Sequence, residues 1–170
     1  MADRENPTAA LEGRRQPGVR LPSLDLSGCN LEGADLSEMR LSGSNFAGAN
    51  LRKANLRGAF LDGADLRGAD LRGAVLEFAV LGGADLSNAN LSGADIRCAN
   101  LVGAKAHHAE FSRADLFYAR PGNADLEGAS FEGANIERTI FRRADLRGAV
   151  LTGATGQANF ENANLEGARR

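Results

Sequence analysis

The chain has 170 residues, which is room for one domain, and its 20 basic and 22 acidic residues leave a formal net charge of -2. This balance excludes a strong electrostatic field that would attract nucleic acid or an anionic membrane. With 21 glycines, one tyrosine and no tryptophan, the composition also excludes an ordinary core of large interdigitating side chains. A repetitive architecture must replace such a core.

The first 20 residues do not share the pattern that follows them. The opening MADRENPTAALEGRRQPG lacks the apolar segment of a secretion signal or a membrane helix, so we expect a cytoplasmic protein without membrane contact. Asn6 is placed to cap a short helix with Pro7 at its first position, which would lay Leu11 over the next segment. A frayed tail is the alternative. Residues 1–20 are therefore predicted to be a tail or a short capping helix.

From Leu26 to Leu151 an apolar residue recurs at every fifth position, called the centre below. Of these 26 centres, 24 are Leu, Ile or Phe, and the exceptions are Ala106 and Pro121. Two residues before the centre, Ala fills 21 of 26 places, and two residues after it, at the corner position, Gly fills 15 of 26. An internal repeat of this regularity determines the fold.

A helix cannot use a spacing of five, because the apolar positions would be distributed around its whole circumference. In an extended chain, residues two apart point to the same side, so the centre and the small residue before it face inward together. The chain must then turn before the next repeat, and Gly suits a corner that needs positive φ. The sequence therefore predicts short sides that form coils, stacked as parallel strands about 4.8 Å apart.

The number of sides follows from exceptions at the position before the centre, which is Asp or Asn in most repeats. When the exceptions are sorted by a period of 20, one column of six contains five of them: Arg40, Phe60, Val80, Arg120 and Ile140. A period of 15 scatters them. Four sides per coil are therefore predicted.

Repeats such as ADLRG, ANLRG and ADLSN resemble the pentapeptide repeat family over residues 21–168, the predicted repeat domain. The resemblance implies an all-β fold, a right-handed quadrilateral parallel β-helix of about seven coils. After Leu151 the centres resume at Phe160 and Leu165, one residue early. A distorted last coil is expected.

Apolar residues at positions that should face water form a predicted contact surface along one edge of the rod. Such a patch on a soluble protein usually marks an interface, either with a second copy or, less readily, with another protein. The alternative is that single Val and Phe residues merely favour β structure. The candidate surface consists of Phe60, Val75, Phe78, Val80, Cys98, Val102, Phe117 and Tyr118.

Catalytic chemistry is not indicated, and we expect no catalytic, cofactor or metal site. His107 and His108 are the only histidines, and a metal site there would need further ligands such as Glu110. A weakened corner is the preferred interpretation. Pro121 cannot donate to a strand ladder, so its repeat is expected to form a local bulge.

Two classes of function remain. The first is a non-catalytic scaffold that binds protein. The second comes from the resemblance, which implies that some family members bind DNA gyrase by mimicking duplex DNA and protect it from gyrase poisons. The candidate acidic face for such mimicry is Asp25, Asp65, Asp85, Asp125 and Asp145. Interspersed arginines oppose this alternative, because a DNA mimic should be strongly acidic, and direct nucleic-acid binding is not expected.

Overall fold

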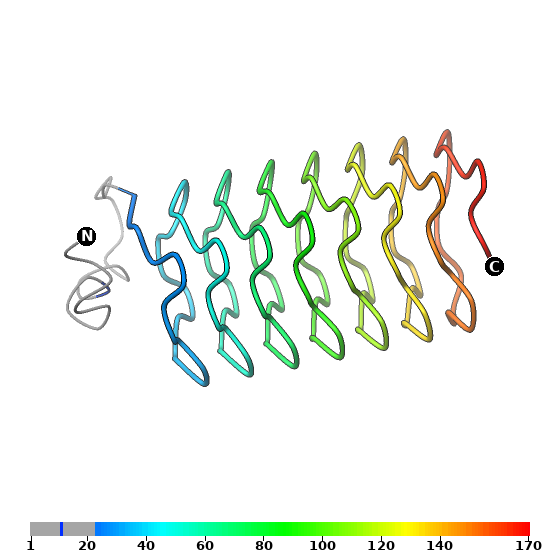
Figure 1. Cartoon of the computed structure of the whole chain (residues 1–170). Helices are drawn as coiled ribbons and strands as arrows, with labels where there is room; N and C mark the ends of the chain where they lie inside the picture. Colours follow the sequence, from blue (N-terminus) through cyan, green and yellow to red (C-terminus); the bar gives the residue numbers. More distant parts are fainter. Residues whose placement is uncertain (1–10, 12–22) are drawn as a thin grey trace.

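The computed structural model describes Leu11 and residues 23–170, and the latter form a rod of stacked coils (Figure 1). Within residues 23–170 the backbone has no helix, and its β structure consists of isolated parallel bridges, one in each repeat. Asp25 pairs with Asn45 and Asn45 pairs with Asp65, so a bridge joins residues 20 apart. Four repeats therefore complete one turn of the coil, as predicted. The right-handed sense and the number of coils stay predictions.

The corners follow from one backbone conformation. The N–H of Ala49 donates to the carbonyl of Phe46 over 2.9 Å, and between them Gly48 has a φ of 64°, which is the geometry of a type II turn. From Gly28 to Gly153 every corner residue has a φ between 53° and 71°. Glycine adopts this conformation without steric cost, whereas other residues pay about 1 kcal/mol or more.

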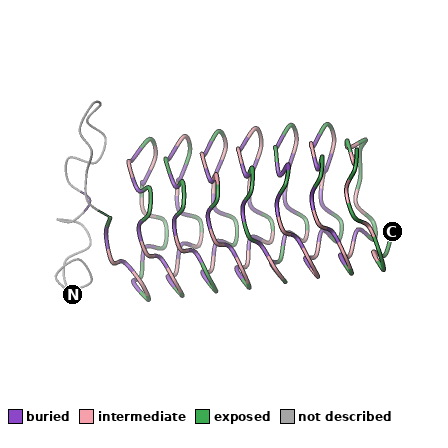
Figure 2. Cartoon of the chain, turned by 90° about the horizontal axis from the view of Figure 1, so that it is seen from above, coloured by how far each residue is buried: buried purple, intermediate pink, exposed green. Residues whose placement is uncertain are grey.

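The core is a shaft filled by the centres and the small residues that precede them. Leu56, Leu76 and Ala74 are fully buried, and Figure 2 shows buried positions recurring along the coils except the last, where residues 152–170 are half-buried or exposed. The prediction that the centres and the small residues before them face inward is therefore confirmed. The burial supplies the main stabilisation, because each buried leucine is worth about 2 kcal/mol.

One coil has an incompletely filled core. Ala106 replaces a leucine-sized centre, and the larger Phe111 follows it, stacked on Phe131 with ring centroids 4.9 Å apart. An internal cavity of about 10 Å³ remains, and its lining is Leu101, Ala104, Ala106, Phe111, Leu116, Pro121, Ala124, Leu126 and Phe131. A space this small and apolar has room for about one water but no polar group to hold it.

The bulge predicted at Pro121 is wrong. Lys105 pairs with Asp125 and Asp125 pairs with Asp145, so the spacing of 20 continues through this repeat. Pro121 is buried as a normal centre, and the corner at Asn123 has a regular φ of 55°. The proline costs its own ladder hydrogen bond, because it has no N–H to donate, and the bridge between Arg120 and Ile140 is lost with it.

The one-residue deletion is visible in the pairing of the last coil. Thr155 lies on Asn135, 20 residues away, whereas Ile140 pairs with Asn159, 19 residues away. Gly156 absorbs the change with a φ of 97°, and a Cβ there would lie 2.6 Å from the backbone of Glu137. The predicted slip is therefore confirmed, and it depends on this glycine.

The prediction for residues 1–20 lies outside the described residues, apart from Leu11. Leu11 has helical backbone, is 9% exposed and belongs to the apolar cluster of the core. No helix among the described residues is long and apolar enough to cross a membrane.

Candidate protein-interaction surface

One side of the rod carries most of the predicted surface, and we call it the apolar face. It consists of three parallel rows, each running along the rod with one residue per coil. The central row is Arg40, Phe60, Val80, Asn100, Arg120 and Ile140. Bridges join its members from Arg40 to Arg120, and the Ile140 N–H donates to the carbonyl of Ala119 over 2.9 Å. The preceding corner row is Glu38, Gly58, Phe78, Cys98, Tyr118 and Arg138, and the following row is Ser42, Asp62, Gly82, Val102, Gly122 and Arg142.

The large exposed apolar side chains gather on this face. Among residues 23–170, those at least 40% exposed are Phe60, Phe78, Val102 and Tyr118, and all four belong to its rows. Val80 and Cys98 are half-buried between them. Since the other sides carry no large apolar side chain of comparable exposure among these residues, the four define a single patch.

The structure does not bring all the predicted residues together. Phe117 lies on the neighbouring side, but its ring packs edge-on against Tyr118 with centroids 4.6 Å apart, so it supports the patch. Val75 lies on that neighbouring side in a ladder between Asn55 and Asp95. Its neighbours in the ladder are polar, and it stands apart from the patch.

Four consecutive corners of the apolar face, from Phe78 to Arg138, accept an unfavourable backbone. Phe78, Cys98 and Tyr118 have φ values of 60°, 58° and 57°, in the left-handed region that costs a non-glycine residue about 1–2 kcal/mol. A bulky side chain there is a genuine outlier. Non-glycine corners on other edges, such as Lys53 and Arg113, have the same backbone, so this cost is shared among corners of the rod and does not by itself mark a contact surface.

Guanidinium groups border the aromatic rings. Arg57 lies over the Phe78 ring at 5.4 Å from its centroid and Arg138 over the Tyr118 ring at 5.1 Å, and the Tyr118 hydroxyl also accepts a hydrogen bond from Arg138. These contacts hold the rings in place by cation–π attraction. The patch is thus partly preorganised.

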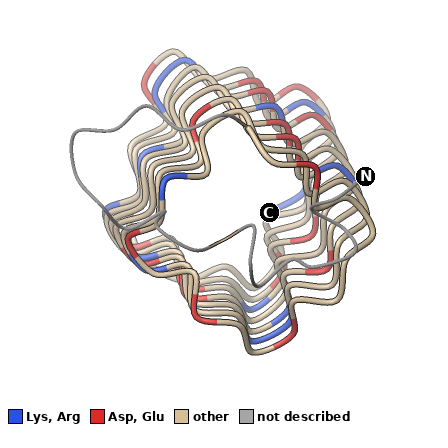
Figure 3. Ribbon diagram, turned by 90° about the vertical axis from the view of Figure 1, so that its left-hand side faces the viewer, with Lys and Arg blue, Asp and Glu red and all other residues tan. Residues whose placement is uncertain are grey.

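The acidic residues predicted as a second surface do stack in one ladder, but they are not free charges. Asn45 and Lys105 interrupt the ladder. Arg67 pairs with Asp65 at 2.6 Å and Arg147 with Asp145 at 2.8 Å, and the hydrogen bonds from these arginines hold the pKa of both carboxyls below the usual range. Figure 3 shows acidic and basic residues interspersed along the rod.

The histidines have a neighbourhood that the sequence did not reveal. His107 Nε2 lies 2.9 Å from Asp125 Oδ2, and ligand atoms of His107, Asp125 and Glu127 lie within 4.8 Å of one another. Glu110, the partner considered from the sequence, instead accepts a hydrogen bond from Ser112. The period of 20 could have indicated this neighbourhood, because His107 and Glu127 are 20 residues apart and therefore stack in neighbouring coils. Arg147 already pairs with Glu127 at 2.9 Å, so a cation would have to displace this arginine.

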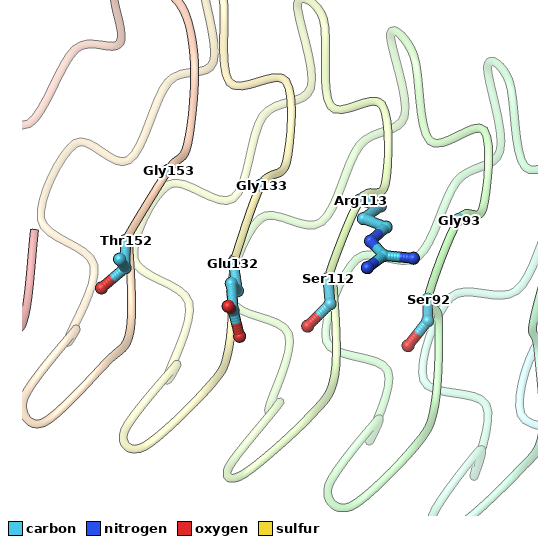
Figure 4. Close-up of a pocket in the computed structure, with 8 residues that line it drawn as sticks. All are labelled: Ser92, Gly93, Ser112, Arg113, Glu132, Gly133, Thr152 and Gly153. Atoms are coloured by element: carbon cyan, nitrogen blue, oxygen red, sulfur yellow. The ribbon is translucent and has the colours of Figure 1, made fainter.

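A shallow polar groove of about 600 Å³ follows another corner of the rod (Figure 4). Its lining is Ser92, Gly93, Ser112, Arg113, Glu132, Gly133, Thr152 and Gly153. The lining contains no histidine or cysteine that would form a nucleophile–base pair with the serines. The groove offers hydroxyl groups and backbone, without an arrangement for acyl or phosphoryl transfer.

The comparisons with known proteins agree with the fold. The model of the pentapeptide repeats matches residues 25–63, 49–88, 84–117 and 122–155 in eight copies. The chain belongs to the pentapeptide repeat family. Proteins of this family are generally non-enzymatic structural or interaction proteins. Among curated protein sequences, none matches the chain significantly.

Three solved structures of pentapeptide repeat proteins are similar to this chain. HetL, involved in heterocyst differentiation regulation in the cyanobacterium Nostoc sp. strain PCC 7120, is 31% identical, and the match covers 99% of this chain and 95% of HetL with a TM-score of 0.45. A trypsin-treated variant of QnrB1, a plasmid-mediated fluoroquinolone resistance protein, is 24% identical over 84% of this chain and 77% of QnrB1 with a TM-score of 0.59. A protein of the Arabidopsis thaliana thylakoid lumen is 35% identical over 71% of this chain and 67% of its own with a TM-score of 0.29.

Proposed function

We propose that this protein is a non-catalytic scaffold that binds a protein partner through its apolar face. The observation that carries the proposal is the gathering of Phe60, Phe78, Val102 and Tyr118, each at least 40% exposed, on one side of the rod. Burying exposed aromatic and aliphatic side chains is the main driving force of protein association.

DNA mimicry with gyrase as the partner is the alternative, and the ladder of aspartates is its only support. Arginines neutralise Asp65 and Asp145, and Lys105 stands between Asp85 and Asp125. We therefore place this alternative second. A DNA-supercoiling assay with gyrase tests it: inhibition at micromolar protein would favour mimicry, and no effect would dismiss it.

The double variant Phe78→Ser/Tyr118→Ser tests the proposed surface. Serine removes both rings but leaves a non-glycine residue at each positive-φ corner, so the backbone requirement is unchanged. We therefore expect the fold to be retained, and self-association and the binding of a partner to be lost. The matched control is Lys53→Ser/Arg113→Ser, which changes two exposed corners with φ values of 54° and 59° on another edge of the rod. Unchanged solution mass and unchanged binding in the Phe78/Tyr118 variant would refute the proposal.

A further inference from the structure

We propose that the occupant of the apolar face is a second copy of this chain, packed face to face with the two rods antiparallel. This inference rests on the proposed function of that face and adds the identity of the partner and its register. The twofold axis runs across the face, midway between Val80 and Asn100. Each row of one copy then lies on the same row of the other copy, read in the opposite direction.

This register fixes which residues meet. In the first corner row Glu38 faces Arg138, Gly58 faces Tyr118 and Phe78 faces Cys98. In the central row Arg40 faces Ile140, Phe60 faces Arg120 and Val80 faces Asn100. In the last row Ser42 faces Arg142, Asp62 faces Gly122 and Gly82 faces Val102. Every pair occurs twice because the contact is symmetric.

The pairs are complementary in size. Tyr118, which is 41% exposed, meets Gly58, and Val102, which is 40% exposed, meets Gly82, so each projecting side chain meets a residue without a side chain. Glu38 Cγ and Asp62 Oδ1, which lie 3.5 Å and 3.3 Å from where the two Cβ atoms would stand, must turn aside to admit it. Phe78, at 50% exposed, meets the small Cys98. Close packing of this kind is what distinguishes a specific interface from a merely apolar one.

The pairs are also complementary in charge. Three of the four arginines of the face, Arg120, Arg138 and Arg142, lie at one end, whereas Glu38 and Asp62 lie towards the other end together with Arg40. The antiparallel arrangement brings Arg138 to Glu38, which forms an ion pair, and brings Arg120 towards the Phe60 ring, over which Arg40 of the same chain lies at 6.0 Å from the centroid. If the rods were parallel, Arg120 would face Arg120 of the second copy, and Arg138 would face Arg142. Like-charge repulsion disfavours both contacts.

A shift by one coil loses the fit. Phe78 would then meet Tyr118, Val102 would meet its own copy, and Gly82 would meet Gly122. Two large pairs would hold the faces apart while two glycines left a gap between them. The size pattern therefore selects the register in which Glu38 reaches Arg138.

The contact should be weak, because the face is small. Six coils at the strand spacing are roughly 29 Å long and the side of a coil is roughly 15 Å wide, which gives about 400 Å² per copy. Interfaces of this size belong to transient complexes. Self-association is therefore expected at tens to hundreds of micromolar protein, roughly the affinity range of small interfaces.

Charge exchange tests the arrangement in the full chain. Sedimentation velocity between about 10 µM and 1 mM, a range chosen for weak association, should show a monomer–dimer equilibrium. Either Glu38→Arg or Arg138→Glu should weaken it by roughly tenfold or more, and the double variant should restore it. Five coils, about 24 Å, separate the two residues within one chain, so the restoration must arise between copies. Arg113→Glu, the same exchange at an exposed corner of another edge, should have no effect.

Two outcomes overturn the inference. A monomer at every concentration, or a dimer insensitive to both single exchanges, excludes the face-to-face pair. Restoration by Asp62→Arg with Arg142→Asp, in place of the Glu38 and Arg138 pair, excludes the register, because those residues meet only after a shift of one coil. If the wild-type chain stays monomeric but binds another protein that the Phe78→Ser/Tyr118→Ser variant does not bind, the proposed scaffold function stands and the second copy is excluded.

Discussion

The cavity beside Ala106 provides a direct test of how the core is filled. The Ala106→Leu variant restores the usual centre and adds three carbon atoms next to a cavity of about 10 Å³. Full burial of three carbons would contribute about 2.4 kcal/mol. Ordering the leucine side chain costs about 0.5–1 kcal/mol, and the added atoms must displace Phe111 slightly. Because the cavity has room for only about one of the three carbons, the gain and the cost nearly cancel, and we expect the Tm to stay within about 2 °C of the wild type.

The matched control is Ala74→Leu. Ala74 is fully buried in a coil whose four centres are leucine, so the same three atoms have no space and should cost about 1–3 kcal/mol. Thermal unfolding followed by circular dichroism compares the two variants under one condition. If Ala106→Leu lowered the Tm as much as Ala74→Leu does, the described cavity and the compensating role of Phe111 would both be refuted.

Three further predictions follow from single contacts. Ser44→Ala should lower stability by about 1–2 kcal/mol in urea unfolding, because the buried Leu24 N–H donates to Ser44 Oγ at 3.0 Å and would lose its acceptor; an unchanged urea midpoint contradicts this. Phe78→Gly should raise stability by about 1 kcal/mol, since it relieves a φ of 60°, and a loss would show that the ring stabilises the monomer. The hydrogen bond from Arg97 lowers the pKa of Asp95 in the folded protein. The stabilisation by this ion pair is therefore complete above the unfolded pKa, about 4, and is lost as the pH falls through the folded pKa. On acidification, the urea midpoint of Asp95→Asn should fall less steeply than that of the wild type.

The fold was predictable because one spacing carries it. A period of five with small and branched residues inside leaves only a coil with corners, and the exceptions at Phe60, Val80 and Ile140 revealed the period of 20. The same rule indicated a missing residue after Leu151, and the pairing in the structure places it between Thr155 and Asn159. The bulge at Pro121 was a misjudgement, because a buried centre makes only one ladder hydrogen bond through its N–H, and losing this bond does not require an extra residue.

The candidate surface was less predictable, because it depends on how sides meet at a corner. Val75 and Phe117 occupy the same side of the rod, yet only Phe117 reaches the patch, through its contact with Tyr118. His107 was compared with its sequence neighbour Glu110, whereas its contact is Asp125 in the next coil. The period of five does not determine in which direction a corner side chain points. The sequence therefore indicated only which edge of the rod is apolar, and the structure showed which residues form the face.

Site-specific photocrosslinking tests the central claim, that the apolar face is the contact surface, most directly. A photoreactive phenylalanine analogue at residue 78 should give crosslinked adducts at 100 µM protein, roughly the concentration that a small interface requires, and the adducts should form with residues of the same face. The same analogue at residue 53, an exposed corner with a φ of 54° on another edge, should give none. Equal yields from both positions, or adducts from residue 53 alone, would contradict the account.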